Sequence, residues 1–221
     1  MFYLPNNPEN MPEALSDITV LDCSQILAGP FCSMLLSDMG AKVIKIEKPS
    51  GGDDTRRFGP PFIKNESAAF LAMNRNKRSI VIDFKHENGV EIMKNLSKDS
   101  TIIIENYRTG VMEKLGLGYE DLKKINPKII YCSISGFGRT GPYAERGGFD
   151  LVAQGMSGLM SITGIPNSPP IKVGVPIADM NAGMFATYSI LSAYIHMLKS
   201  GEGQYLEVSL LESALAYTVW E

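Results

Sequence analysis

The chain of 221 residues has a formal net charge of −3 and 44% hydrophobic residues, which is typical of a globular protein and speaks against a broad nucleic-acid-binding surface. Three cysteines without a CxxC pair and only two histidines give no support to a disulfide framework, a zinc ribbon or a Ser-His-Asp triad, so no metal site is expected. Residues 1–15 show neither a secretion signal nor a transit-peptide pattern, and no apolar run suits a membrane span.

Short apolar runs alternate with helical patterns along the chain. The apolar runs predict strands at Ile18–Leu21, Lys42–Ile46, Ser79–Phe84, Thr101–Ile104, Lys128–Ile134 and Gln204–Ser209. The helical patterns cover Phe31–Met39, Glu87–Leu96, Tyr119–Ile125 and Asp179–Lys199, with a further helix starting at Leu211. We expect the helix from Asp179 to be long and mostly buried, and we expect Lys48–Pro61, which is rich in glycine and proline, to be a functional loop.

This alternation indicates an α/β protein with a Rossmann-like parallel sheet and helices on both faces. We expect residues 1–200 to form a large domain, and residues 201–221 to begin a linker or a smaller second domain that is cut short, because the chain ends inside an apolar helical pattern. Ligands of such sheets bind outside the carboxyl ends of the strands. A site is therefore expected in the loops after Leu21, Ile46, Ile104 and Ile134.

The segment Gly136–Gly141 matches the pattern GxGxxG and follows a predicted strand. A dinucleotide-binding fingerprint requires this loop to open directly into an apolar helix. Here Pro142–Gly148 follows, which is typical of a loop, and no acidic residue ends a second strand about 20 residues further on. We therefore favour a flexible loop that shapes a site over a nicotinamide-binding or flavin-binding loop.

Asp179 lies directly before an apolar helical run. An aspartate in this place is ordinarily an N-cap residue that accepts hydrogen bonds from backbone amides. A catalytic interpretation uses the same position, because the helix dipole and the free amides would keep the carboxylate ionised. Its small neighbours Ala178, Ala182 and Gly183 would leave room for a substrate carbonyl, and a carboxylate is a known nucleophile in covalent catalysis. The residues alone leave both interpretations open.

Seven motifs follow one another along the chain: LDCSQILAGP, KVIKIEKPSGGDDTR, NRNKRSIVIDFK, ENYRTGVMEKLGLGYEDL, ISGFGRTGPY, the segment around Asp179, and GEGQYLEVSLLES. From about Ile18 onward the chain resembles the class III CoA transferases of the CaiB/BaiF type, which include formyl-CoA transferase, carnitine CoA-transferase and the α-methylacyl-CoA racemases. The runs GGDDTRRFGPPF and AMNRNKRS most resemble the succinate–hydroxymethylglutarate CoA-transferase branch. The chain corresponds to the amino-terminal half of these proteins, which are about twice as long.

The resemblance implies that Asp179 is the catalytic carboxylate. By the mechanism of the family, it attacks an acyl-CoA thioester to give a mixed anhydride and CoA thiolate, and the thiolate then attacks the aspartyl carbonyl to give an enzyme–CoA thioester. An incoming acid reverses these steps and leaves as the new CoA ester. Coenzyme A thioester is thus expected as a substrate, and no cofactor is expected to stay bound.

The resemblance also implies contacts with coenzyme A on several segments. Ile26, Leu27 and Ala28 would lie near the thiol arm, Lys48 near the phosphates, and Ile82, Asp83, Phe84 and Lys85 along the adenine and ribose. Asn106, Tyr107 and Lys114 match a further family segment, and Ser135, Gly136 and Phe137 lie on the loop that follows the next strand. Lysine suits phosphate as a point charge, with solvated surface charge as the alternative interpretation of Lys48, Lys85 and Lys114.

Two positions depart from related proteins. The racemases of the family pair an aspartate with a histidine in a Gly-His-Asp segment, whereas Gly148-Phe149-Asp150 stands here, and Phe149 cannot exchange a proton. The formyl-CoA branch has a glutamine where Leu27 stands. Racemisation and a formyl or oxalate role are therefore disfavoured.

The favoured function is the transfer of CoA from an acyl-CoA, with succinyl-CoA as the donor, to a short carboxylic or dicarboxylic acid. A racemase or epimerase of the same family and a non-catalytic, truncated CoA-binding fragment are the alternatives. The resemblance implies a homodimer, interlocked in full-length relatives, with no nucleic-acid or membrane partner, in the cytoplasm or alternatively in the mitochondrial matrix. Candidates for a carboxylate clamp, each with solvated surface as the alternative, are Arg56, Arg57, Arg75 and Arg139.

Overall fold

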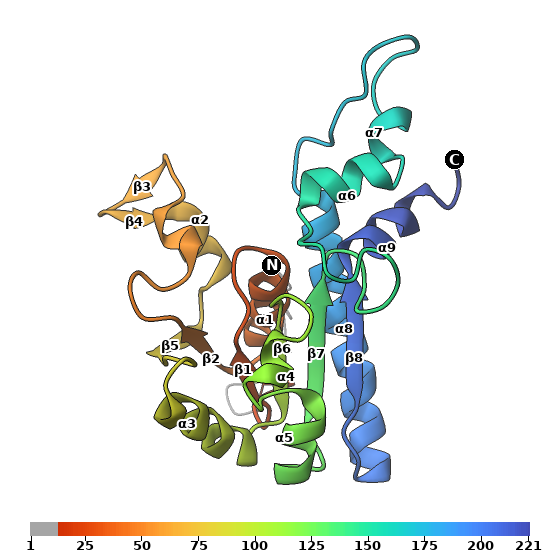
Figure 1. Ribbon diagram of the computed structural model, residues 1–221. Coiled ribbons are helices and arrows are strands. Elements are labelled where there is room, and N and C mark those ends of the chain that lie inside the picture. The colour runs from red at the N-terminus through yellow and green to blue at the C-terminus, as the bar shows by residue number, and fades with distance from the viewer. Residues whose placement is uncertain (1–12) are drawn as a thin grey trace.

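The computed structural model describes residues 13–221 (Figure 1). The segment before residue 13, where the sequence shows no targeting pattern, lies outside these residues. Between residues 13 and 221, no helix combines the length and the hydropathy that crossing a bilayer requires.

Six strands form one parallel sheet. They are β1 (Thr19–Asp22), β2 (Lys42–Glu47), β5 (Lys77–Val81), β6 (Ile102–Glu105), β7 (Ile130–Ser135) and β8 (Tyr205–Ser209). Across the sheet they lie in the order β5-β2-β1-β6-β7-β8, and every neighbouring pair is parallel. Counted along the chain, this is the 3-2-1-4-5-6 order of the Rossmann fold, which reverses direction between β1 and β6. The predicted α/β fold is therefore confirmed.

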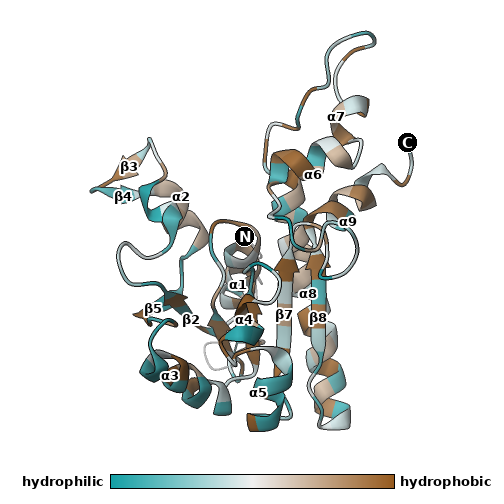
Figure 2. Cartoon of the chain, in the orientation of Figure 1, coloured by the Kyte–Doolittle hydropathy of each residue, from teal (hydrophilic) through white to brown (hydrophobic). Residues whose placement is uncertain are grey.

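Helices cover both faces of the sheet (Figure 1). One face carries α1 (Ala28–Asp38) and α8 (Ile177–Ser200), and the other carries α3 (Glu87–Lys98), α4 (Val111–Lys114) and α5 (Tyr119–Ile125). The helices α6 (Asp150–Met156), α7 (Leu159–Ile162) and α9 (Leu210–Leu215) lie beyond the carboxyl ends of the strands (Figure 1). Strand side chains alternate between the two cores, so that Ile102 and Ile104 lie in the first and Ile103 in the second. Figure 2 shows hydrophilic colour on the outward sides of α3 and α5.

A smaller unit stands beside the sheet and was not predicted. It contains the 3-10 helix η1 (Asp54–Arg57), the antiparallel pair of β3 (Phe62–Ile63) and β4 (Glu66–Ser67), and α2 (Ala68–Met73). Asp53 caps η1 by accepting a hydrogen bond from the backbone N–H of Thr55 at 2.9 Å. The glycine-rich and proline-rich segment from Lys48 is therefore partly ordered by local hydrogen bonds.

Several predicted boundaries differ from the observed ones, and two elements are displaced most. The strand expected at Ser79–Phe84 is β5 at Lys77–Val81, because Asp83 accepts a hydrogen bond from the N–H of Lys85 and starts the turn that leads into α3. The helix expected from Phe31 begins at Ala28, since Pro30 fits the first helical turn, where a missing N–H leaves no helical hydrogen bond unmade.

α8 is long, as predicted, but only one of its faces is fully buried. Ala182 and Ala186 lie on the buried face, whereas Met184 and Tyr188 are 51% and 53% exposed. The expectation of a mostly buried helix is therefore wrong, because α1 and the sheet cover only one side of α8.

The chain after α8 returns to the sheet. β8 pairs with β7 as the outermost strand, and α9 packs against α8 and α6. The short 3-10 helix η2 (Ala216–Thr218) follows. That residues 201–221 lead into a smaller second domain stays a prediction about the complete protein.

Candidate active site

Two neighbouring cavities of about 430 Å³ and 410 Å³ open among the loops at the carboxyl ends of the parallel strands. They share Gln25 and Tyr107, which follow β1 and β6, the two strands between which the strand order reverses. The first cavity, here called the Asp179 cavity, contains the predicted residues Ile26, Leu27, Ala28, Asn106, Tyr107, Ser135, Gly136 and Asp179. The second, here called the lysine cavity, contains the predicted residues Lys48, Ile82, Asp83, Phe84, Lys85, Tyr107 and Lys114.

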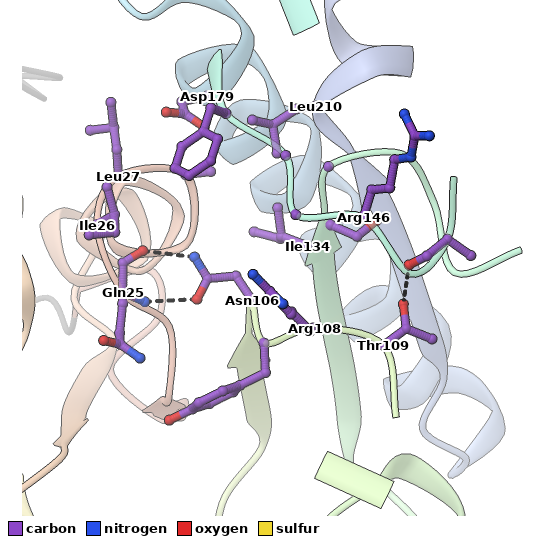
Figure 3. Close-up of a pocket in the computed structure, with 18 of the residues that line it drawn as sticks. Gln25, Ile26, Leu27, Asn106, Arg108, Thr109, Ile134, Arg146, Asp179 and Leu210 are labelled. Carbon is purple, nitrogen blue, oxygen red and sulfur yellow. Dashed lines mark hydrogen bonds between the residues drawn. The ribbon is translucent and has the colours of Figure 1, made fainter. Parts of the chain in front are cut away.

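Hydrogen bonds fix the loop between β1 and α1, which forms one wall of the Asp179 cavity (Figure 3). Asn106 Nδ2 donates to the carbonyl of Gln25 at 2.7 Å, and Asn106 Oδ1 accepts from the N–H of Gln25 at 2.8 Å. The carboxylate of Asp53 accepts from the N–H of Ile26 at 3.3 Å. These bonds hold Ile26 at a φ of 72°, a conformation that a β-branched residue adopts only when its surroundings impose it.

Buried charges support the same loop from the sheet side. Lys45 Nζ lies 2.9 Å from Asp53 Oδ2 and donates to the carbonyl of Ser24 at 2.9 Å. Lys77 Nζ donates to Asp22 Oδ2 at 3.1 Å. Burial opposes the ionisation of Asp22, but the ammonium groups of Lys77 and Lys45 hold the pKa of Asp22 well below its usual range. Removal of one partner would leave a buried charge uncompensated, so this network keeps the loop rigid.

Asp179 is the third residue of α8 and borders the cavity (Figure 3). A residue of α6 caps the helix instead: Asp150 Oδ1 accepts from the N–H of Ala178 at 2.8 Å and from the N–H of Asp179 at 3.3 Å. Within residues 13–221 the carboxyl group of Asp179 has no hydrogen-bond partner. The N-cap interpretation of Asp179 is therefore wrong, and its carboxyl group is free to meet a ligand.

Burial, together with the negative charge of Asp150, raises the pKa of Asp179 to about 7. The expectation that the helix dipole keeps this carboxylate ionised is wrong, and the magnitudes explain why. A helix N-terminus stabilises a carboxylate by about 0.3–1 kcal/mol, whereas the difference between a pKa of 3.8 and one of about 7 corresponds to about 4 kcal/mol. Near neutral pH a large fraction of Asp179 is protonated, and its ionised form is a poorly solvated, basic carboxylate.

The small residues beside Asp179 serve helix packing and do not make room for a substrate. Ala178 and Ala182 are fully buried. A Cβ atom on Gly183 would lie 2.7 Å from the carbonyl oxygen of Ala28 in α1. The predicted role of these residues is therefore wrong: they let α8 approach α1 closely, and the space in front of Asp179 comes from the loops.

The GxGxxG segment borders the Asp179 cavity through a close backbone crossing. A Cβ atom on Gly136 would lie 2.4 Å from Gly148 Cα, and one on Gly148 would lie 2.2 Å from Gly136 Cα. The segment Gly136–Gly141 leads into a loop, and the next helix, α6, begins only at Asp150. Glycine is thus needed where the loop after β7 crosses the segment that enters α6. Phe137, a predicted site residue, lines neither cavity and packs against the ring of Tyr143.

The lysine cavity combines apolar walls with ammonium groups. Ile82 and Phe84 supply apolar surface. Lys48 pairs with Asp54 at 2.8 Å, whereas Lys85 and Lys114 form no ion pair with any residue that the structure describes. Apolar surface next to free ammonium groups suits a ligand that has both a ring system and phosphates.

The four arginines that the sequence offered as carboxylate clamps are all engaged inside the protein. Their guanidinium groups contact acidic side chains, so none of the four presents an unpaired fork to a ligand. The pairs are Arg56 with Glu47 at 2.6 Å, Arg57 with Asp54 at 3.1 Å, Arg139 with Glu105 at 2.6 Å, and Arg75 with Asp38.

Sequence reasoning missed a further group of residues that line the Asp179 cavity: Gln25, Phe58, Arg108, Thr109, Ile134, Ala144, Arg146, Gly147 and Leu210. Arg108 follows Asn106 and Tyr107 in the loop after β6, so the rule that ligands meet the carboxyl ends of strands already pointed to it. Phe58 and Arg146 lie in loops, and loops have no hydrophobic periodicity from which their path could be predicted.

Metal-ligating side chains do not converge at these cavities. Among residues 13–221, no group of three or more His, Cys, Asp or Glu side chains is placed to hold a metal ion. Cys23, Cys32 and Cys132 are buried thiols, and burial raises the pKa of Cys32 to about 12, so its thiolate is scarce at neutral pH.

Comparison with known proteins places this arrangement of strands, loops and side chains. The model of CoA-transferase family III matches residues 15–221. The chain belongs to CoA-transferase family III. It is 48% identical over 209 residues to a succinate–glutarate CoA-transferase of Agrobacterium fabrum, with 92% of this chain and 52% of that protein covered. It is 45% identical over 212 residues to a succinyl-CoA:glutarate CoA-transferase of Homo sapiens, with 96% of this chain and 48% of that protein covered.

A solved structure is similar to the chain as well. The crystal structure of a CaiB/BaiF family protein from Brucella suis has a TM-score of 0.91 and 45% identity, and covers 95% of this chain and 56% of that chain. The predicted family is thereby confirmed. The family III chain described here spans about half the length of the curated relatives it matches.

Phe149 is the middle residue of the segment Gly148-Phe149-Asp150, which on the sequence alone disfavours racemisation. Its side chain is 74% exposed and borders the Asp179 cavity. An exposed ring offers apolar contact area to an acyl chain but has no proton to exchange.

Proposed function

We propose that the protein is a CoA-transferase that moves CoA from an acyl-CoA, with succinyl-CoA as the donor, to a short carboxylic or dicarboxylic acid. The supporting observation is the unpaired carboxyl group of Asp179 in a cavity that adjoins a second cavity with the free ammonium groups of Lys85 and Lys114. The two relatives named above support the choice of acids, because their names contain succinate or succinyl-CoA together with glutarate.

In the first half of the reaction, the carboxylate of Asp179 attacks the thioester carbonyl, forms a mixed anhydride and releases CoA thiolate. The thiolate then attacks the aspartyl carbonyl, so the donor acid leaves as a carboxylate and Asp179 carries CoA as a thioester. In the second half, the acceptor carboxylate attacks this thioester to form a new anhydride, and the released thiolate attacks the acceptor carbonyl. The new acyl-CoA leaves and the carboxylate of Asp179 is restored.

The start of α1 supplies a group that suits the developing oxyanion. The N–H of Ala28 has no acceptor among residues 13–221, and Ala28 lines the Asp179 cavity. The buried charges and the bonds from Asn106 hold this helix start in place before substrate arrives, and such preorganised donors are a large source of rate enhancement. The raised pKa of Asp179 makes its ionised form a more basic nucleophile, at the expense of a smaller ionised fraction below pH 7.

We also propose that the protein acts as a homodimer. Large apolar side chains are exposed near the site on α6 and along α8, among them Leu151, Val152, Met184 and Tyr188, and exposed apolar surface of this kind is typical of an interface. For the compartment we propose the cytoplasm, with the mitochondrial matrix as the alternative, because three buried free thiols suit a reducing setting.

The test is a transfer assay with the complete natural protein. Succinyl-CoA is incubated with glutarate, 3-hydroxy-3-methylglutarate, oxalate or pentanoate, without ATP or added metal, and the CoA esters are separated by chromatography. Wild-type protein should form a new CoA ester, Asp179→Ala should form none, and Asp99→Ala, a change at an exposed aspartate outside both cavities, should behave as wild type. Transfer by Asp179→Ala at the wild-type rate, or no transfer by wild type to any acid, would contradict the proposal.

A further inference from the structure

One of the seven arginines in the chain combines two features: it has no ion pair with any residue that the structure describes, and its side chain enters the cavity that Asp179 also lines (Figure 3). Four arginines are engaged by acidic side chains, as described above, and Arg78 is exposed on β5 outside both cavities. The guanidinium of Arg146 lies over the ring of Tyr143, with Cζ 4.4 Å from the ring centroid, and points out of the cavity in Figure 3. Arg108 has no ion pair within residues 13–221 and points into the Asp179 cavity (Figure 3).

The backbone on both sides of Arg108 is fixed. Asn106 is bound to Gln25 by two hydrogen bonds, and Thr109 Oγ1 donates to the carbonyl of Ala144 at 2.7 Å. The loop after β6 is thereby joined to the loop after β1 on one side and to the loop after β7 on the other. A guanidinium presented from such a loop loses little further freedom when it binds a ligand.

The space around the guanidinium group is kept open by glycine. A Cβ atom on Gly147 would lie 3.8 Å from Arg108 Nη2, so the guanidinium already lies against the backbone at that position. A longer side chain there would extend toward the guanidinium group, whereas glycine leaves its N–H groups accessible to a ligand in the cavity.

The cations of the two cavities differ in kind. The lysine cavity presents ammonium groups, which bind phosphate as point charges, and the Asp179 cavity presents a planar guanidinium, which matches a carboxylate with two parallel hydrogen bonds. The lysine cavity thus suits the phosphates of a ligand, and the Asp179 cavity suits a carboxylate that does not itself react.

We propose that Arg108 binds the non-reacting carboxylate of a dicarboxylic acid while the other carboxyl group of that acid reacts at Asp179. This inference rests on the proposed CoA transfer and deepens it, because it names dicarboxylic acids as the substrate class and Arg108 as the residue that selects them. The same contact would serve the free carboxylate of a succinyl donor.

The experiment compares glutarate with pentanoate, which has the same chain length but one carboxylate fewer. In a two-step exchange through an enzyme–CoA intermediate, kcat/KM for the acceptor reports only the steps after the acceptor binds, so the donor does not affect the comparison. The variants are Arg108→Gln, which removes the charge, and Arg108→Lys, which keeps the charge but cannot donate two parallel hydrogen bonds to a carboxylate. Arg78→Gln is the control.

Wild-type protein should prefer glutarate. Arg108→Gln should lower kcat/KM for glutarate by about 10-fold to 100-fold, the usual effect of losing a hydrogen-bonded charge pair, and should leave pentanoate within about twofold. Arg108→Lys should fall in between, and Arg78→Gln should match wild type. With the donor varied, Arg108→Gln should raise KM for succinyl-CoA and leave KM for butyryl-CoA unchanged.

Four results would overturn the inference. An equal loss for both acids would make Arg108 a structural residue, a rise in KM for every CoA ester alike would assign it to a phosphate of CoA, and unchanged kinetics would give it no role. A wild-type protein that transfers CoA without preferring glutarate would contradict the role of Arg108 alone, whereas a wild-type protein that transfers CoA to no acid would contradict the proposed function itself.

Discussion

Replacement of Asp179 by asparagine should stabilise the folded protein while it abolishes CoA transfer, because this carboxyl group is held where ionisation is unfavourable. Burial and the charge of Asp150 raise the pKa of Asp179 from 3.8 to about 7. A carboxyl group with a higher pKa in the folded state binds its proton more tightly there than in the unfolded chain. The contribution of Asp179 to the free energy of unfolding therefore becomes less favourable as the pH rises from 3.8 towards 7.

The size of the effect follows from these two pKa values. Relative to a neutral side chain, Asp179 lowers the free energy of unfolding by about 2 kcal/mol at pH 5 and by about 4 kcal/mol at pH 8. The variant also loses the favourable interaction of the carboxylate with the start of α8, about 0.3–1 kcal/mol. The expected net gain for Asp179→Asn is thus about 2 kcal/mol at pH 5, where the carboxyl group in the folded protein is protonated and has no such interaction to lose, and about 3–4 kcal/mol at pH 8.

The assay is urea unfolding at both pH values, with the free energy obtained by linear extrapolation. Circular dichroism is the better signal, because the single tryptophan, Trp220, is 92% exposed and its fluorescence would change little on unfolding. The control Asp99→Asn changes an exposed aspartate outside both cavities and should shift the free energy of unfolding by less than about 0.5 kcal/mol at either pH. An Asp179→Asn protein that is no more stable than wild type at pH 8, or whose gain does not grow with pH, would refute the reasoning.

Three further changes test separate parts of the site. Asp150→Asn removes the charge next to Asp179 but keeps a side-chain oxygen that accepts hydrogen bonds from the α8 amides. The pKa of Asp179 should therefore fall, and the acidic limb of the pH profile of kcat/KM should move below its wild-type position near pH 7. An acidic limb that does not move would show that the two carboxyl groups are not coupled. Asn106→Leu breaks both hydrogen bonds between Asn106 and the loop after β1. It should lower the free energy of unfolding by about 1–3 kcal/mol in urea titrations and lower kcat by at least about 10-fold in steady-state kinetics. Wild-type values in both assays would contradict the positioning role of Asn106. Gly136→Ala places a Cβ atom 2.4 Å from Gly148 Cα and should lower the free energy of unfolding by about 2 kcal/mol. In the control Gly174→Ala the new Cβ atom meets no atom within 4 Å. Equal stability of the two variants would contradict the close backbone crossing.

The fold was accessible to sequence reasoning because central strands carry apolar residues towards both faces. Ile102, Ile103 and Ile104 are all fully buried, and such a run predicts a strand inside a covered parallel sheet. The edge strand β5 was misplaced for the same physical reason, since Arg78 and Val81 are exposed and its hydrophobic pattern is weak. The helices α6 and α7 were missed because Leu151, Val152 and Ile162 are themselves exposed and give no clear period.

The candidate site could be predicted only in part from the sequence. Asp179 could be named as a candidate from the sequence, but its state depends on Asp150, which lies 29 residues away along the chain and is brought next to it by the packing of α6 on α8. The partners of the arginines are equally distant: Arg75 pairs with Asp38, 37 residues away, and no local pattern shows this pairing. Long-range ion pairs and caps form only when elements pack, so they cannot be predicted from spacing.

The most direct test of the central claim is the chemical state of Asp179 after the protein has met succinyl-CoA. Borohydride reduces an aspartyl thioester to an alcohol, which converts Asp179 into homoserine, and peptide mass spectrometry locates the change. The account predicts this conversion at Asp179 only when acyl-CoA was present, and none in Asp179→Asn. Active protein whose Asp179 stays unmodified, or a modification on another carboxyl group, would contradict it.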